Sequence, residues 1–209
     1  FSAQNIRIEN GFYVFDVKTP AEVVQNVKFG LPGHHNLTNA LLAFAMAKSY
    51  GVSNEKIISA LASFKGVRRR FSFQIREENR VFIDDYAHHP TEINAVHQAV
   101  RELYPGKKII AAFQPHLFSR TKDFADGFAE SLAQADELLL LDIYPARELP
   151  IPGVTSDMLL SAMTIEKKQV MSKEQLLAWA ATTEDKLIVM AGAGDIDVCI
   201  NQIKDILTK

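Results

Sequence analysis

Two aspartates, a tyrosine, two histidines and a proline stand together in the stretch DDYAHHP, which begins at Asp84 and follows the apolar run VFI. Packing a hydrophobic core requires none of these charged side chains, so their density favours a loop with a chemical role. The simpler interpretation is a capped turn between a strand and a helix, because Pro90 fits the first turn of a helix. Carboxylates and imidazoles also bind divalent metals. A metal-dependent hydrolase would use Asp84, Asp85, His88, His89 and His116 as ligands.

A second polar stretch, FQPHLFSRT, contains His116, Ser119 and Arg120. Arginine can hold a carboxylate or a phosphate through two parallel hydrogen bonds. Near the start of a helix its charge opposes the helix dipole, so Arg120 is expected to have an anionic partner. This stretch therefore indicates an anion-binding loop, with a solvated arginine as the alternative.

The stretch GHHNLTN places Asn36 and Asn39 three residues apart, on one side of a predicted helix. A carboxamide donates and accepts hydrogen bonds at once, which is the pattern that reads the N6 and N7 edge of adenine. The alternative is that Asn36 is only the N-cap of the helix and Asn39 an exposed polar residue.

Arginines and glycines form two further motifs. In GVRRRF, Arg68 and Arg69 are expected to be solvated, while Arg70 is expected to turn inward toward a nucleotide phosphate. AGAGDID has Asp197 where a dinucleotide fingerprint would have its third glycine, so we expect a tight turn that presents backbone N–H groups. The chain contains no G-x-x-x-x-G-K-[ST] phosphate-binding loop.

From Phe71 onward, apolar runs alternate with amphipathic stretches, which predicts a mostly parallel α/β sheet with helices on both faces. The predicted strands are VFID, KIIAAFQ, ELLLLDIY, KKQVM and KLIVMAG, and the predicted helices span residues 91–103, 123–134, 156–162, 173–181 and 196–207. The stretches DDYAHHP, QPHLFSRT, DIYPARELPIPG and GAGD follow four of these strands. Because ligands bind at the carboxyl ends of parallel strands, the four loops are expected to form one site.

The first 70 residues have a different pattern. NIRIE, FYVFDV and EVVQNVKFG predict three short antiparallel strands with a hairpin turn at Asn10-Gly11. Two helices are expected to follow, with N-caps at Asn36 and Ser53, and the first is expected to end at Gly51. We therefore predict one domain at residues 1–70 and a Rossmann-like domain at residues 71–209.

The net charge, the length of the apolar runs and the cysteine content argue against several classes of function. The formal net charge of -2 provides no overall positive field for nucleic acid or anionic lipid. No apolar run approaches the roughly 20 residues that span a bilayer. The single cysteine, Cys199, is expected to be a buried small hydrophobe, and its isolation fits a reducing cytoplasm. The chain begins at Phe1 within a strand pattern, so we expect it to be a piece of a longer protein.

Six stretches together resemble the C-terminal part of the Mur ligases, and in particular the members that join L-alanine to UDP-N-acetylmuramate. They are GHHNLTNALLAFAMA, FKGVRRRF, DDYAHHPTEI, FQPHLFSRT, DIYPARELPIPGV and AGAGDI. The resemblance implies three domains, of which residues 1–70 would be the end of the central ATP-binding domain and residues 71–209 the C-terminal Rossmann-like domain. It also implies a cytoplasmic, ATP-dependent amide-bond ligase of peptidoglycan precursor synthesis that works through an acyl phosphate.

The same resemblance implies roles for individual residues. The implied ATP contacts are Asn36, Asn39, Arg70 and Asp85. The implied contacts with the acceptor amino acid and the muramoyl group are His88, His116, Ser119 and Arg120. Many relatives carry Arg or Thr where this chain has Leu117, so no contact is carried over to that position. The P-loop and the Mg²⁺ ligands would lie outside this chain, in the missing N-terminal and central domains, and the fragment alone is expected to be inactive.

Two alternatives accompany the metal-dependent hydrolase. One is a murein tripeptide recycling ligase, which attaches a tripeptide to the same sugar and has a similar DDYAHHP loop. The other is a nucleotide-binding module without catalytic activity.

Overall fold

The computed structural model describes residues 1–9, 11–184 and 186–209. The chain divides into two compact units, residues 1–67 with 98–105 and residues 68–97 with 106–209. The division falls after Val67, whereas the predicted boundary follows Arg70. Each unit has its own sheet and its own hydrophobic core.

The first unit is a three-stranded antiparallel sheet with two helices, as predicted. Its elements are β1 (Ser2–Glu9), β2 (Phe12–Lys18), β3 (Val23–Phe29), α1 (His34–Ser49) and α2 (Asn54–Ser63), and β2 is the central strand. Phe15 on β2 and Phe44 on α1 are fully buried in its core. Gly11 has φ 77°, which suits the predicted hairpin turn, while Asn10 lies outside the described residues.

Helix α1 begins earlier than the sequence indicated, so the prediction of Asn36 as its N-cap is wrong. Gly33 is the N-cap, with φ 95°, and the helix starts at His34. The side chain of Asn36 instead donates a hydrogen bond to the carbonyl of Pro32 at 2.7 Å. Gly51, with φ 82°, and the N-cap Ser53 stand where they were predicted.

The end of helix α3 (Pro90–Leu103) belongs to the first unit through a buried tyrosine. The Tyr13 hydroxyl donates to Glu102 at 2.8 Å and accepts from the backbone N–H of Gly33 at 3.1 Å. Burial, together with the hydrogen bond to Glu102, raises the pKa of Tyr13 to about 12. The sequence of α3 does not show that the helix is divided between the two units after residue 97, because the helix itself is continuous.

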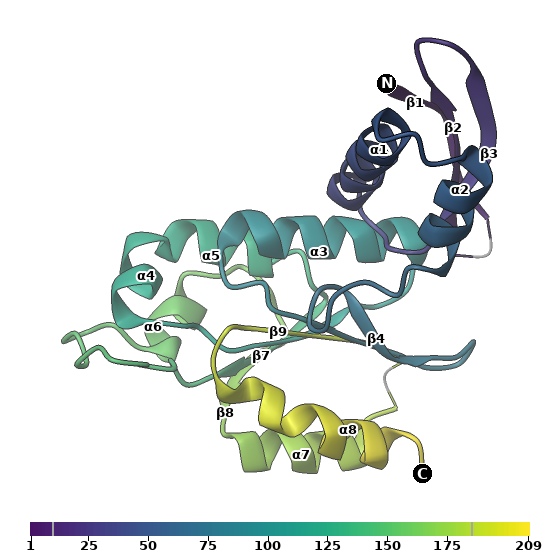
Figure 1. Cartoon of the computed structure of the whole chain (residues 1–209). Helices are drawn as coiled ribbons and strands as arrows, with labels where there is room; N and C mark the ends of the chain where they lie inside the picture. The colour runs from purple at the N-terminus through teal and green to yellow at the C-terminus, as the bar shows by residue number, and fades with distance from the viewer. Residues whose placement is uncertain (10, 185) are drawn as a thin grey trace. The chain divides into compact units, whose positions relative to one another are not determined.

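The second unit is a six-stranded sheet in the order β4-β5-β9-β6-β7-β8 (Figure 1). Its strands are β4 (Ser72–Arg76), β5 (Val81–Asp85), β6 (Ile110–Phe113), β7 (Glu137–Leu141), β8 (Lys168–Met171) and β9 (Leu187–Ala191). All neighbouring strands pair in parallel except β4, which is antiparallel to β5. The predicted α/β fold class is confirmed. Strand β4 was not predicted, because its sequence SFQIR has no continuous apolar run.

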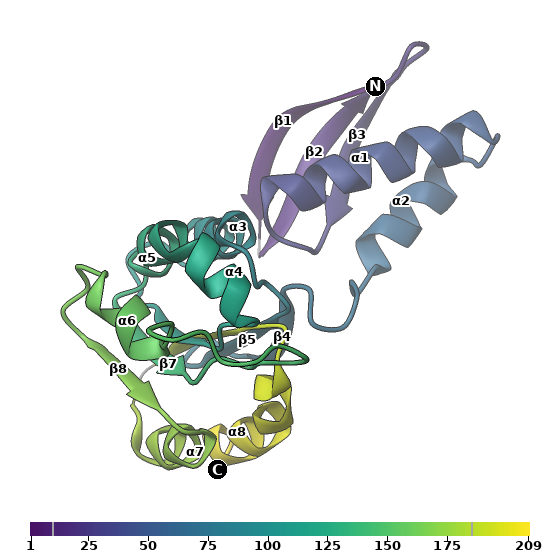
Figure 2. The ribbon, with the colours of Figure 1, turned by 90° about the vertical axis from the view of Figure 1, so that its left-hand side faces the viewer.

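Helices cover both faces of this sheet. Figure 1 shows α7 and α8 on one face and α3 and α5 on the other, and Figure 2 shows α7 beside α8. The remaining elements are α4 (Phe118–Asp123), α5 (Ala125–Leu132), α6 (Ser156–Ser161), α7 (Lys173–Thr182), the short 3₁₀ helix η1 (Asp195–Cys199) and α8 (Ile200–Leu207). The chain at Phe124 leaves helical geometry, with φ -115°, so α4 and α5 are separate helices. The helix predicted for residues 123–134 is α5, and α4 was not predicted.

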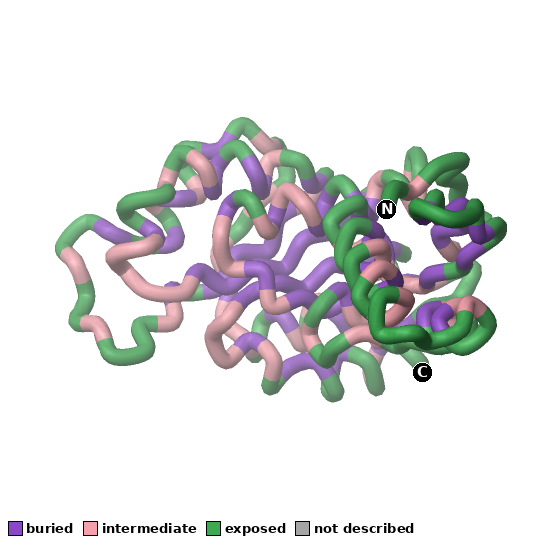
Figure 3. The backbone as a smooth tube through the Cα atoms, turned by 45° about the horizontal axis from the view of Figure 1, so that its top comes forward, coloured by how far each residue is buried: buried purple, intermediate pink, exposed green. Residues whose placement is uncertain are grey.

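The central strands are buried along their whole length (Figure 3), which explains their continuous apolar sequences. Cys199 is a free, buried cysteine, as predicted. In the described part of the chain, no helix has the length and apolar character needed to cross a membrane.

Candidate ligand site at the carboxyl ends of the strands

The carboxyl ends of the middle strands lie level with one another. Asp85, the last residue of β5, pairs with Ala191 of β9, and Ala191 also neighbours Phe113 of β6. The four polar loops that follow β5, β6, β7 and β9 therefore leave the sheet at the same edge. Contacts between them, described below, bring the loops into one group.

Asp85 ties two backbone segments to the end of β5. One carboxylate oxygen accepts from the N–H of Phe71 at 2.6 Å, and the other accepts from the N–H of Ala87 at 2.7 Å. Burial raises the pKa of Asp85, and these two N–H groups partly offset that rise. The side chain thus has a structural role at the point where the implied nucleotide contact was expected.

Asp84 and Arg69 form a buried charged pair on the other face of β5. The Asp84 side chain is 1% exposed, and its nearest approach to the Arg69 guanidinium is 3.6 Å. Among the described residues, neither oxygen of Asp84 has a hydrogen-bond partner. Burial raises the pKa of Asp84 to about 6, although the charge of Arg69 opposes the shift.

Arg69 links three segments, so the prediction that it is solvated is wrong. Its guanidinium donates to the Gly192 carbonyl at 2.6 Å, lies 3.2 Å from the carboxylate of Asp197 and sits 5.0 Å from the Tyr86 ring centroid. Its own φ is +59°, a left-handed geometry that costs energy for a non-glycine residue. With this positive φ, the Arg69 side chain leaves the backbone in a different direction from the one it would take if residue 69 were in an extended conformation.

Arg70, predicted to turn inward, is the more exposed of the two, with 54% of its side chain accessible. Its guanidinium lies 3.7 Å from Glu92 and 5.7 Å from the Tyr86 ring centroid. A guanidinium with one loose ion pair retains donors for a further anion. Arg70 is therefore available to a ligand in a way that Arg69 is not.

His88 is fixed by Glu92, four residues later. The backbone N–H of His88 donates to the Glu92 carboxylate at 2.9 Å, and the ring atom Nδ1 lies 2.9 Å from the Tyr86 carbonyl and 3.3 Å from Glu92. Both neighbours of Nδ1 accept hydrogen bonds only, so Nδ1 carries a proton. Burial opposes ionisation of Glu92, but the N–H and charge of His88 and the charge of Arg70 leave the pKa of Glu92 below its usual range.

His116 has the opposite tautomer. Its Nδ1 lies 3.2 Å from the Arg120 guanidinium, which can only donate, so Nδ1 accepts and the proton of the neutral ring is on Nε2. Burial lowers the pKa of His116, and the charge of Arg120 lowers it further. The ring stacks on Tyr144 at 5.8 Å between centroids and lies 6.3 Å from the ring of His88. The anionic partner predicted for Arg120 is therefore replaced by a neutral imidazole.

Ser119 is paired with a loop residue that the sequence did not single out. Its backbone N–H donates to one carboxylate oxygen of Glu148 at 2.9 Å, and its hydroxyl donates to the other. These hydrogen bonds lower the pKa of Glu148. Leu117, two residues earlier, has φ 72° and ψ 134°, a conformation that glycine adopts far more readily than leucine.

The AGAGD turn after β9 packs against Gln114. The Gln114 side chain donates to Asp195 at 2.9 Å and accepts from the N–H of Ile196 at 2.8 Å. A Cβ at Gly194 would approach Gln114 and lie 2.6 Å from the Cβ of Tyr144, so the turn requires glycine there. Burial raises the pKa of Asp195, but hydrogen bonds from Lys173 and Gln114 outweigh it and bring the pKa below its usual range. The helix predicted from Ile196 begins instead as η1 at Asp195.

The two asparagines implied as adenine contacts lie in the other unit. Asn36 and Asn39 are both on α1, and Asn39 is exposed. They are described within that unit, separately from the strand-end loops.

The described residues do not form the metal centre that the alternative of a metal-dependent hydrolase would require. In ranges 1–9, 11–184 and 186–209, no three side chains of His, Cys, Asp or Glu are arranged to hold a metal ion. Both oxygens of Asp85 bind backbone N–H groups, and His89 packs edge-on against Phe124 at 4.6 Å between centroids. The geometry gives the metal-dependent hydrolase no support.

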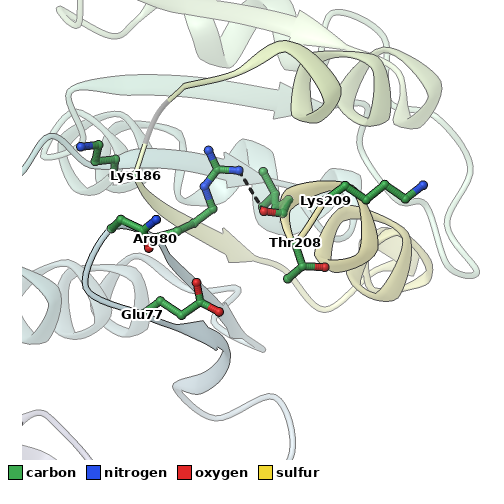
Figure 4. Close-up of a pocket in the computed structure, with 7 residues that line it drawn as sticks. Glu77, Arg80, Lys186, Thr208 and Lys209 are labelled. Carbon is green, nitrogen blue, oxygen red and sulfur yellow. Dashed lines mark hydrogen bonds between the residues drawn. The ribbon is translucent and has the colours of Figure 1, made fainter.

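A cavity of about 360 Å³ lies at the opposite end of the same sheet, beside the first residues of β5 and β9 (Figure 4). Arg80 donates there to the carbonyl of Leu207, near the end of α8, at 3.0 Å. An arginine that caps a helix C-terminus is favourable for the fold. The cavity is lined by Glu77, Asn79, Arg80, Lys186, Leu207, Thr208 and Lys209. None of the predicted ligand contacts is among them.

Four residues of the strand-end site were missed from the sequence. They are Arg69, Gln114, Tyr144 and Glu148. Gln114, Tyr144 and Glu148 lie within stretches already recognised as strand-end loops, so position after a buried strand was the signal for them. Arg69 had no such signal, because three adjacent arginines look alike in sequence.

A mostly parallel sheet that gathers imidazoles, guanidinium groups and carboxylates at the carboxyl ends of its strands has the arrangement at which α/β domains commonly bind ligands. The chain belongs to the Mur ligase family, because the model of the Mur ligase glutamate ligase domain matches residues 69–194.

Two curated relatives are similar along nearly the whole chain. The UDP-N-acetylmuramate–L-alanine ligase of Flavobacterium johnsoniae is 60% identical over 209 residues, and that of Flavobacterium psychrophilum is 63% identical over 204 residues. The two alignments include 100% and 98% of this chain, respectively. They include 46% of the length of each relative, so the chain spans less than half of either protein. The solved UDP-N-acetylmuramate-alanine ligase of Thermotoga maritima matches with a TM-score of 0.80 and 26% identity, over 97% of this chain and 44% of that one.

Proposed function

We propose that this chain provides the C-terminal part of an ATP-dependent ligase that joins L-alanine to UDP-N-acetylmuramate in peptidoglycan precursor synthesis. The observation that carries the proposal is 60% identity over all 209 residues to a relative that bears this name. The chain covers less than half of that relative, so the proposal concerns the full-length protein that contains it.

The geometry of the strand-end loops supports the same chemistry. Arg120 offers a guanidinium whose contact is a neutral ring, His116, so its charge is not neutralised by that contact. An anionic ligand would supply the missing counter-charge. We propose that His88, His116, Ser119 and Arg120 face the acceptor amino acid and the muramoyl carboxylate.

A second set of residues is proposed to hold ATP. Arg70 is exposed enough to reach a phosphate. Asp85 holds the backbone N–H groups of Phe71, which follows Arg70, and of Ala87. Asn36 and Asn39 present carboxamides from one side of α1, which suits an adenine edge.

The proposed reaction has two steps. A muramoyl carboxylate oxygen attacks the γ-phosphorus of ATP, the bond from that phosphorus to the bridging oxygen breaks, and ADP leaves. The amine nitrogen of L-alanine then attacks the acyl carbon, and inorganic phosphate leaves with the electrons of the C–O bond. The nitrogen loses two protons between the ammonium form and the amide.

The proposal includes Mg²⁺ with ATP, a cytoplasmic location, and N-terminal and central domains of the same protein as partners. The described residues of this chain have no arrangement that fits a metal ion, so no step is assigned to Mg²⁺ here. No role with nucleic acid or membrane is proposed.

The test is ADP release by the full-length protein with UDP-N-acetylmuramate, comparing L-alanine with the murein tripeptide as acceptor. Alanine-dependent ADP release is expected, and Arg120→Ala should lower kcat/KM for L-alanine by about 100-fold because a charge-assisted contact is lost. Arg147→Ala, which removes an exposed arginine of a neighbouring loop, is the matched control. Turnover with the tripeptide alone would favour the recycling ligase, and no turnover with either acceptor would refute the proposal.

A further inference from the structure

Glu148 is a carboxylate held in place beside the proposed acceptor site. It lies between β7 and α6, and both of its oxygens accept hydrogen bonds from Ser119, one from the backbone and one from the hydroxyl. The side chain remains accessible on one side, since the residue is only partly buried. Because these bonds lower its pKa, Glu148 is negatively charged at neutral pH.

Charges of both signs therefore flank His116. The charge of Arg120 lowers the pKa of His116, and the charge of Glu148 raises it, so both charges act on the same ring. Arg120 directly follows Ser119, the residue that holds Glu148. A guanidinium and a carboxylate are thus presented by two loops at one place, yet they are not paired with each other in the contacts that the structure gives for them.

A free α-amino acid carries the complementary pair of charges. Its carboxylate matches a guanidinium, and its ammonium group has three donors that match a carboxylate. Each oxygen of Glu148 accepts one hydrogen bond from Ser119 and retains capacity for a second. Glu148 can therefore receive an ammonium group without releasing Ser119.

We propose that Glu148 binds the α-ammonium group of the acceptor amino acid while Arg120 binds its carboxylate, which makes Glu148 a specificity-determining residue. This inference rests on the proposed ligase function and adds a residue to it. A carboxylate that is already stabilised as an anion is a weak base. Glu148 therefore orients the amino group, and a different base removes the proton of the ammonium group.

A competing interpretation predicts the opposite effect. Glu148 could occupy the donors of Ser119 in the free protein and have to be displaced by the carboxylate of the substrate. Removing its charge would then tighten the binding of L-alanine. Under our proposal the same change weakens it, so the sign of the effect separates the two.

The experiment uses Glu148→Gln and Glu148→Asp in the full-length protein, with KM measured separately for L-alanine, ATP and UDP-N-acetylmuramate. We expect Glu148→Gln to raise KM for L-alanine about ten- to hundredfold, the range for loss of a charge-assisted hydrogen bond. KM for the other two substrates and the melting temperature should stay within about twofold and 2 °C of wild type. Glu130→Gln, an exposed glutamate on α5, controls for loss of one negative charge.

The two variants also separate a binding role from a structural one. Gln keeps the length needed to hold Ser119 but loses the charge, whereas Asp keeps the charge on a shorter side chain. An ammonium-binding role therefore predicts a lower KM for L-alanine in Glu148→Asp than in Glu148→Gln, and a role in holding Ser119 predicts the reverse order.

Each remaining outcome decides against the inference. A KM for L-alanine that is unchanged or lower in Glu148→Gln overturns it, and so does a parallel change in all three KM values with a lower melting temperature. Absence of alanine-dependent ADP release in the wild type would be a failure of the proposed function, and it is recognised before any variant is made.

Discussion

Replacing Asp84 with asparagine is expected to make the second unit more stable at neutral pH. The Asp84 carboxyl is 1% exposed, has no hydrogen-bond partner among the described residues and lies 3.6 Å from its counter-ion, Arg69. Burial of this kind favours the neutral form, which asparagine imitates without an ionisable group.

The size of the effect follows from the pKa shift. The pKa of Asp84 rises from 3.8 to about 6 in the folded chain. At about 1.4 kcal/mol per pH unit, the shift corresponds to about 3 kcal/mol. The folded state binds this proton more tightly than the unfolded state does. The stabilisation of the fold by the bound proton is therefore fully present below about pH 4, is lost as the pH rises through about 6, and is absent at higher pH. The gain in Asp84→Asn should therefore be near zero at pH 4 and about 3 kcal/mol at pH 7.5.

Urea unfolding measured between pH 4 and pH 8 tests this prediction. The single tryptophan, Trp179, packs against the core of the second unit, so its fluorescence reports on the unit that contains Asp84. Asp123→Asn, which changes an exposed aspartate at the end of α4, is the control and should show no such pH dependence. A less stable Asp84→Asn protein at pH 7.5, or a difference that does not vary with pH, would mean that the ionised carboxylate stabilises the fold.

Two further predictions concern backbone geometry in the strand-end loops. Gly194→Ala should lower the free energy of unfolding by about 1–3 kcal/mol, because its Cβ would lie 2.6 Å from Tyr144 and crowd Gln114, and an unchanged urea midpoint would contradict that steric reasoning. At Leu117, where φ is 72°, the glycine variant should be more stable than the alanine variant by about 1 kcal/mol or more, which reverses the usual order of the two residues, and thermal melting of both proteins would show it.

The class of fold was readable from the sequence because the buried strands keep one physical signature. The runs at β5, β6, β7 and β9 are apolar except for Asp84 and Asp85 at the end of β5 and Glu137 at the start of β7, as is typical of strands covered on both faces. Strand β4 lacks that signature because it lies at the edge of the sheet. Helix α4 was not predicted either, because its six residues are too few to show a helical period.

The site was only partly readable, because side-chain direction depends on backbone geometry that a sequence does not display. Arg69 has a positive φ and a largely buried side chain whereas Arg70 is exposed, and nothing in three adjacent arginines indicates this difference. The pairing of Ser119 with Glu148 joins loops from two strands, so it depends on sheet order. Position at strand ends was predictable, and the partner of each side chain was not.

The two adjacent aspartates at the end of β5 have a consequence for how the sheet aligns. Val81, Phe82 and Ile83 are all apolar and all buried, so this part of the strand would fit its neighbours equally well after a shift of one residue. Successive side chains point to opposite faces, so such a shift would turn the side chains of Asp84 and Asp85 each to the opposite face of the sheet. Asp84 would lose Arg69, and Asp85 would lose the N–H groups of Phe71 and Ala87. The acidic doublet therefore selects a single register for a strand whose hydrophobic residues cannot select one.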